Sequence, residues 1–158
     1  MFDLINGVPL HPLVVHAVVV LLPLATLGTL AIAARPSWRP RYGWLVVAAA
    51  AVATALIPVA TASGEALEKR VGDPGRHAQL GDQLIWFAVP LLVTSAAMVW
   101  VDRRRTSSRE PGSPTLLRVV ATLAVIAALA SAVQVYRVGD SGARAAWGDV
   151  PAAGSGDH

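Results

Sequence analysis

The sequence predicts an all-α membrane protein in which four transmembrane helices form one bundle, joined by short extracytoplasmic helices. Of its 158 residues, 54% are apolar and 15% are charged, and the mean hydropathy is +0.55. Soluble domains carry about 25% charged residues, so this deficit indicates that lipid surrounds much of the chain. The length accommodates one domain, residues 1–148, followed by a disordered tail at 149–158.

Each predicted transmembrane helix contains enough apolar residues to cross the hydrocarbon core. A helix rises about 1.5 Å per residue, so about 20 residues span the roughly 30 Å core. The predicted spans are residues 13–34, 43–62, 84–101 and 116–135. We expect that the first span is not a cleaved signal peptide, because the residues before it include no basic residue and the apolar stretch is longer than the hydrophobic region of a signal peptide.

The connecting segments are shorter and more polar than the spans. Short surface helices are expected at 65–71 and after Asp140, which can cap a helix. Residues 106–115 are expected to form a flexible loop. Alanine pairs such as Ala49/Ala53 and Ala124/Ala128 predict that the second and the fourth span each pack tightly within the bundle, because small residues let helix backbones approach. We find no internal repeat in the sequence.

The arginines predict the orientation of the chain. Twelve of the thirteen basic residues are arginines, and most lie after the first and third spans. The loop at 63–83 is more acidic, and the amino-terminal segment has no basic residue. The positive-inside rule therefore places both termini outside the cytoplasm. No basic stripe interleaved with aromatic residues is present, so the sequence predicts the lipid bilayer, and not nucleic acid, as a partner.

Three histidines lie on the predicted extracytoplasmic side and are the candidates for chemistry. His11 and His16 flank the start of the first span, and His77 precedes the third. Five helical residues separate His11 from His16 by about 7.5 Å along the axis and roughly 140° around it. These two imidazoles therefore do not form a two-histidine metal clamp on one helix face.

One interpretation is that imidazoles from two helices bind the iron of a b-type haem. Such a site needs two axial ligands, a slot lined by small residues and polar groups for the propionates. We expect His16 and His77 as axial ligands, with His11 at the mouth of the site and Gly64 in the slot. Arg76 and Arg137 are the candidates for the propionates. The chain has no cysteine, which excludes disulfides, iron–sulfur ligation and covalent haem attachment.

Three other interpretations stay open. The histidines could simply cap helices or bond loop carbonyls, as interfacial histidines often do. The chain could be a non-catalytic subunit or scaffold of a membrane-protein or redox partner. A zinc or copper ion could also bind His11, His77 and a carboxylate, although this ligand spacing is irregular. The sequence leaves enzymatic activity open and favours a chain that is not an enzyme by itself.

The histidine and glycine motifs resemble the family called domain of unknown function 2231, four-span membrane proteins of bacteria. The motifs that carry the resemblance are His11-Pro12-Leu13-Val14-Val15-His16, Gly64, His77, Val135-Tyr136-Arg137-Val138-Gly139 and Gly142. The resemblance implies a protein of the bacterial plasma (inner) membrane with no settled activity. Some relatives are joined to Rieske-type or cytochrome domains, which implies redox work. This chain departs from some relatives at Ala17-Val18, where they have Phe-Pro, and at Asp140, where they have histidine.

Overall fold

The computed structural model describes residues 4–5, 8–71, 75–107 and 113–147. In these residues the helices are α1 (Leu10–Ala34), α2 (Arg39–Val71), α3 (Arg76–Asp82), α4 (Ile85–Ser107) and α5 (Pro114–Trp147). A 3-10 turn, η1 (Pro36–Trp38), joins α1 to α2. Two short antiparallel strands, β1 (Leu4–Ile5) and β2 (Val8–Pro9), precede α1. Four helical segments are long and apolar enough to cross a membrane, which confirms the predicted bundle.

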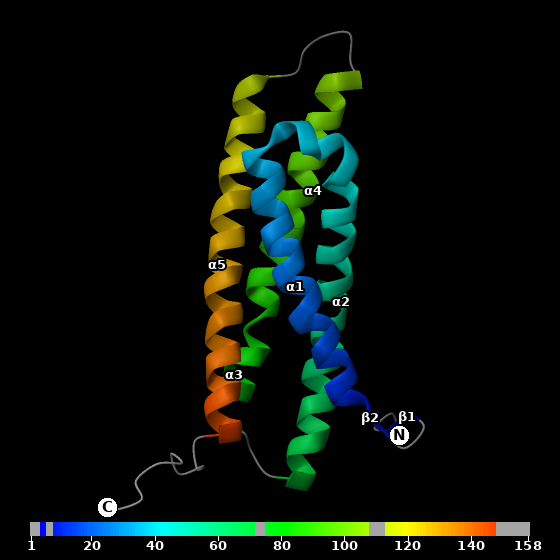
Figure 1. Cartoon of the computed structure of the whole chain (residues 1–158), viewed down its shortest axis with the longest axis vertical. Helices are drawn as coiled ribbons and strands as arrows, with labels where there is room; N and C mark the ends of the chain where they lie inside the picture. Colours follow the sequence, from blue (N-terminus) through cyan, green and yellow to red (C-terminus); the bar gives the residue numbers. More distant parts are fainter. Residues whose placement is uncertain (1–3, 6–7, 72–74, 108–112, 148–158) are drawn as a thin grey trace, which may run out of the picture.

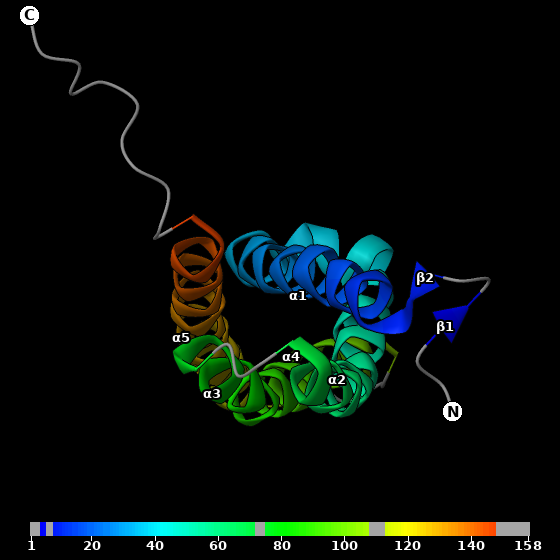
Figure 2. The same cartoon turned by 90° about the horizontal axis from the view of Figure 1, so that it is seen from below.

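The four long helices run alternately up and down (Figure 1). Viewed along the bundle, they follow one another in the order α1, α2, α4, α5 (Figure 2), and each packs against its two neighbours in that ring. The start of α1, helix α3 and the end of α5 lie at the same end of the bundle. We call this end, with His11, His77 and Gly142, the histidine end. The opposite end, with Arg39 and Asp102, is the arginine end.

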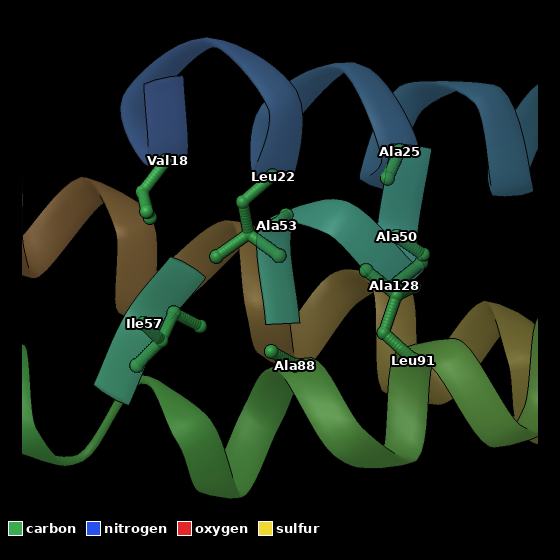
Figure 3. Packing of buried hydrophobic residues seen from close by; sticks show 9 residues of the cluster. All are labelled: Val18, Leu22, Ala25, Ala50, Ala53, Ile57, Ala88, Leu91 and Ala128. Atoms are coloured by element: carbon green, nitrogen blue, oxygen red, sulfur yellow. The ribbon is translucent and has the colours of Figure 1, made fainter. Parts of the chain in front are cut away.

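The core is built mainly from small and branched apolar side chains (Figure 3). Its central cluster contains Val18, Leu22, Ala25, Ala50, Ala53, Ile57, Ala88, Leu91 and Ala128. Ala124 and Ala128 are fully buried as expected, whereas on α2 the buried alanines are Ala50 and Ala53. Helices α2 and α5 lie across the bundle from each other, and each packs against α1 and α4. Large apolar side chains such as Leu27 and Leu45 point outward, where lipid contacts them.

The transmembrane helices extend beyond the predicted spans. The expected surface helix at 65–71 is instead the end of α2, and the helix expected after Asp140 is the end of α5. Both predictions of separate helices were wrong: neither segment contains a proline, and Gly64, Gly139 and Gly142 lie inside the long helices without ending them. The short helix at this end is α3, which lies within residues 63–83, where the sequence predicts a loop. Residues 108–112 of the expected loop and the tail at 149–158 lie outside the described residues.

A buried ion pair locks the arginine end. Arg39 is only 5% exposed, and its Nη1 lies 3.1 Å from Oδ1 of Asp102 on α4. Its Nε donates to the carbonyl of Ile32 at 2.8 Å, and its Nη2 to that of Ala33 at 3.2 Å. These carbonyls belong to the last turn of α1, where intrahelical donors are missing. Arg39 therefore caps α1 and ties it to α4, a packing role beyond the topology signal predicted from sequence.

Other arginines at this end stack on aromatic rings. The guanidinium of Arg104 lies 3.8 Å from the centre of the Trp100 ring, and that of Arg35 lies 5.0 Å from the Trp38 ring. A guanidinium over an aromatic face is attracted by the ring quadrupole. The combination of cations with Trp and Tyr side chains is typical of a membrane–water interface.

Candidate functional site

A cavity of about 760 Å³ lies inside the histidine end of the bundle. Its walls come from α1, α2, α3 and α5 and from Leu84, just before α4. Toward the bundle centre the lining is apolar, with Val18, Leu22 and Ile57 among its residues. Nearer the helix ends the lining becomes polar and includes His11, Glu65, His77 and Asp82. The cavity thus combines an apolar interior with a polar rim, as binding sites for small molecules commonly do.

His11, in the first turn of α1, is held against α2. Its Nδ1 lies 3.0 Å from the carbonyl oxygen of Ala60 and 3.1 Å from Oγ of Ser63. The Ser63 hydroxyl donates to the same carbonyl at 3.0 Å. A Cβ atom placed on Gly64 would lie 3.0 Å from Cε1 of His11, so only glycine leaves the ring this position without displacement. We call Ser63 and Gly64, with the Ala60 carbonyl, the α2 seat.

His77 is held against α5 in the same manner. Its Nδ1 lies 3.2 Å from the carbonyl oxygen of Val138 and 3.3 Å from Oγ of Ser141. The Ser141 hydroxyl donates to that carbonyl at 2.9 Å. A Cβ on Gly142 would lie 3.0 Å from Cε1 of His77. We call Ser141 and Gly142, with the Val138 carbonyl, the α5 seat.

Helix α3, which carries His77, is itself tied to α5. Gln134 is almost fully buried, and its Nε2 donates to the carbonyl of Leu80 at 3.0 Å. Leu80 is the buried residue of α3. The short helix therefore has one apolar anchor and one hydrogen bond to hold its histidine over the α5 seat.

These contacts fix the tautomer of both imidazoles. A backbone carbonyl can only accept a hydrogen bond, so the Nδ1 atoms of His11 and His77 each carry a proton. In the neutral ring, Nε2 then has a free lone pair. A histidine that donates Nδ1–H to a carbonyl while its other nitrogen is free is the form that ligates metals, because the outer bond orients the ring. Both residues line the cavity.

The structure separates the residues that the sequence grouped together. Gly64 lines the cavity beside His11. His16 is exposed, and its Nδ1 forms a hydrogen bond with the Pro12 carbonyl of its own helix. It is absent from the described residues that line the cavity. Arg76 and Arg137 are exposed at the same end of the bundle, also outside the lining. Arg137 lies 3.4 Å from Oε1 of Gln134.

Sequence reasoning missed the two serines and Gly142 as parts of the site. The available signal was a Ser-Gly pair near the outer end of both even-numbered spans, Ser63-Gly64 and Ser141-Gly142. Within the part of the chain that the structure describes, no group of three histidine, cysteine or acidic side chains could hold a metal ion. The described lining of the cavity therefore offers two imidazoles and the carboxylates of Glu65 and Asp82, but no three of these side chains are grouped as a metal site.

Four apolar helices of membrane-spanning length, with lipid-facing leucine and valine side chains, define a multi-pass integral membrane protein. The chain belongs to the family described as predicted membrane protein DUF2231, whose model matches residues 7–152. This match confirms the resemblance seen in the sequence motifs. Comparison with curated proteins and with solved structures finds no match for this chain.

Proposed function

We propose that this protein is a membrane redox module that binds one b-type haem in the cavity, with His11 and His77 as the axial ligands. The observation that carries the proposal is the pair of Nδ1-protonated imidazoles that line one cavity. Their free Nε2 lone pairs suit a metal, and they come from different helices, as a haem between them requires. His16, which the sequence favoured, is the competing axial ligand.

The number of protein ligands favours haem over a bare metal ion. Structural zinc sites use four protein ligands and catalytic sites use three. Haem iron needs only two, because the porphyrin supplies the others. Among the described residues, no three histidine, cysteine or acidic side chains are grouped closely enough to hold a metal ion. The cavity of about 760 Å³ falls within the range of about 300–1,000 Å³ that is usual for ligand sites.

Haem would supply one-electron chemistry, and the chain would supply its position and surroundings. Val18, Leu22 and Ile57 would exclude water from one side of the slot. Arg76 and Arg137 remain our candidates for the propionates, since each precedes a cavity-lining residue in the chain and has an exposed side chain. All three histidines in the described residues lie toward one end. We therefore place the electron donor and acceptor, or a partner protein that carries them, on that side of the membrane.

The first test is the colour and iron content of the protein purified in detergent from haem-supplied cells. We expect one haem per chain and a Soret band that shifts on reduction with dithionite. His11→Ala and His77→Ala should each abolish the low-spin spectrum, because one axial ligand is lost. A colourless, iron-free protein would overturn the proposal and leave the subunit or scaffold interpretation.

His16→Ala decides between the two candidate ligand pairs. If His11 and His77 ligate the iron, the His16 variant keeps the wild-type spectrum, because its ring lies outside the cavity lining. Loss of the band in His16→Ala, with retention in His11→Ala, would instead assign the pair predicted from sequence.

We also propose that the histidine end faces the outside of a bacterial plasma membrane. The arginine end carries Arg35, Arg39 and Arg103, and cytoplasmic loops are enriched in such residues. The natural chain has no cysteine, so single cysteines can be placed at the exposed positions Ser37 and Ala145 without further change. An impermeant thiol reagent added to intact cells should label Ala145→Cys and spare Ser37→Cys. The reverse pattern would refute this orientation.

A further inference from the structure

We propose that this chain is a fused duplication of a two-helix hairpin, and that the cavity is one two-fold site to which each copy contributes a histidine held on a serine–glycine seat. The first copy is α1–α2 and the second is α3–α5. The equivalence of the two seats stands on geometry alone. The identity of the ligand between them rests on the proposed function.

Five of the seven buried residues in the described part of α1 align with buried residues of α3 and α4, and the other two, Val18 and Thr26, align with half-buried leucines. When His77 is aligned with His11, the same shift aligns buried Val14 with buried Leu80. Farther along, without any gap, it aligns further pairs in which both residues are buried: Leu22/Ala88, Ala25/Leu91, Thr29/Ser95 and Ile32/Met98. The polar pair Thr29/Ser95 keeps a hydroxyl at the same depth. In this alignment α3 and α4 together correspond to the single helix α1.

The second helices also share a register. When Ser141-Gly142 is aligned with Ser63-Gly64, three of the four buried residues in the described part of α5 fall on buried residues of α2, and the fourth, Gln134, falls on half-buried Leu56. The aligned buried pairs are Val46/Ala124, Ala50/Ala128 and Ala53/Ser131. The same shift aligns the two carbonyls that accept from the imidazoles, those of Ala60 and Val138. A single ungapped alignment of α2 with α5 therefore matches both their buried faces and their histidine seats.

The arrangement of the helices agrees with a two-fold axis along the bundle. Exchange of α1 with α4 and of α2 with α5 turns the ring α1, α2, α4, α5 into itself (Figure 2). It also preserves direction, because α1 and α4 run one way and α2 and α5 the other (Figure 1). Both histidines stay at the same end under this exchange.

The two seats agree atom by atom. In each, Nδ1 of the imidazole meets a backbone carbonyl, a serine hydroxyl donates to that same carbonyl, and a glycine follows the serine. The clearance of 3.0 Å between Cε1 and a Cβ built on the glycine is the same in both. A ligand in the cavity is therefore offered an equivalent Nε2 lone pair from each copy, which suits a centre with two opposite binding positions. Ser63 and Ser141 act as positioning residues.

Nitrogen-15 NMR of histidine-labelled protein in micelles tests the duplication without any cofactor. In a background with His16→Ala and His158→Ala, only His11 and His77 carry the label. In their neutral form, both rings should show a protonated Nδ1 and a bare Nε2 at closely similar chemical shifts. Different tautomers for the two rings would overturn the proposal.

Matched variants then probe each seat. Ser63→Ala should shift the His11 signals and leave His77 unchanged, and Ser141→Ala should do the converse by a similar amount. Gly43→Ala is the control, because its added Cβ meets Val99 at 2.8 Å, a tight contact far from the seats. It should lower stability without moving either imidazole signal. A serine variant that moves neither signal would refute the positioning role.

The same variants separate this inference from the proposed function. Symmetric imidazole signals in a protein that never takes up haem would support the seats and refute the haem. If haem binds, Ser63→Ala and Ser141→Ala should shift its reduction potential in the same direction and to a similar extent. A shift in only one variant would refute the two-fold site while leaving the haem in place.

Discussion

The ion pair between Arg39 and Asp102 should contribute strongly to the stability of the bundle. The Arg39 side chain is 6% exposed and that of Asp102 is 15% exposed, so water solvates the guanidinium poorly. Removal of one partner from a buried pair costs about 3–5 kcal/mol, because it leaves an uncompensated charge. Since Asp102 retains some exposure, we expect Asp102→Ala to lower the free energy of unfolding by about 3 kcal/mol.

The reciprocal change should cost somewhat more. Arg39→Met removes the ion pair and also the donors to the Ile32 and Ala33 carbonyls. Asp102 keeps some exposure, so water can solvate its unpaired carboxylate, and the loss comes chiefly from these two hydrogen bonds. Hydrogen bonds to charged groups contribute about 1.5–3 kcal/mol each, so we expect a loss of about 4 kcal/mol. In the double variant Arg39→Met/Asp102→Ala no charge is left unpaired. Its loss should be close to that of Arg39→Met alone, which corresponds to a coupling energy of about 3 kcal/mol.

Reversible unfolding in mixed micelles, followed by tryptophan fluorescence, measures all four proteins. The exposed pair Asp140–Arg144, 2.9 Å apart at the other end, is the control, and Arg144→Ala should change the unfolding midpoint little. If the single losses simply add in the double variant to within about 0.5 kcal/mol, the two charges are not coupled and the reasoning fails.

Three further predictions concern the helix contacts, each measured in the same unfolding assay. Ser131→Ala removes the bond from Ser131 Oγ to the Phe87 carbonyl, 3.0 Å between α5 and α4, and should cost about 0.6–1.7 kcal/mol; no loss would mean that the carbonyl finds another donor. Gln134→Ala should cost a similar amount and speed amide exchange in α3 more than in α4, because it cuts the bond to Leu80; equal acceleration in both helices would contradict this. Gly28→Ala places a Cβ 2.7 Å from Val46 and should cost about 1–3 kcal/mol, and Val46→Ala in the same chain should recover part of that loss, which a steric clash requires.

The number of spans was predictable because it depends only on apolar length. Which face of each helix points toward the bundle core was not predictable. In a soluble helix a polar face marks the outside, but here lipid-facing Val19 and core-facing Val18 are both valine. Without that contrast the sequence does not show that His11 lies in register with the buried residues Val14 and Val18 while His16 points away.

The α2 and α5 seats were not predicted from the sequence for a related reason. Ser-Gly is a weak signal on its own, and both residues are usually associated with helix ends or turns. In this protein they lie inside α2 and α5, where the glycine makes room for an imidazole and the serine bonds back to its own helix. The duplication is equally hidden, since few of the aligned residues are identical and the buried positions are shared only as a register.

Each histidine and the residues that hold it are far apart along the chain, which sets the order in which the pocket is completed. His11 precedes its partner, the Ala60 carbonyl, by 49 residues, and His77 precedes the Val138 carbonyl by 61 residues. Because chains emerge and insert from the amino terminus, the first imidazole is secured once α2 has returned across the bilayer, and the second only when α5 has done so. Binding of any molecule that bridges both rings is therefore a late event of biogenesis. A chain truncated before α5 would hold only the His11 imidazole in position.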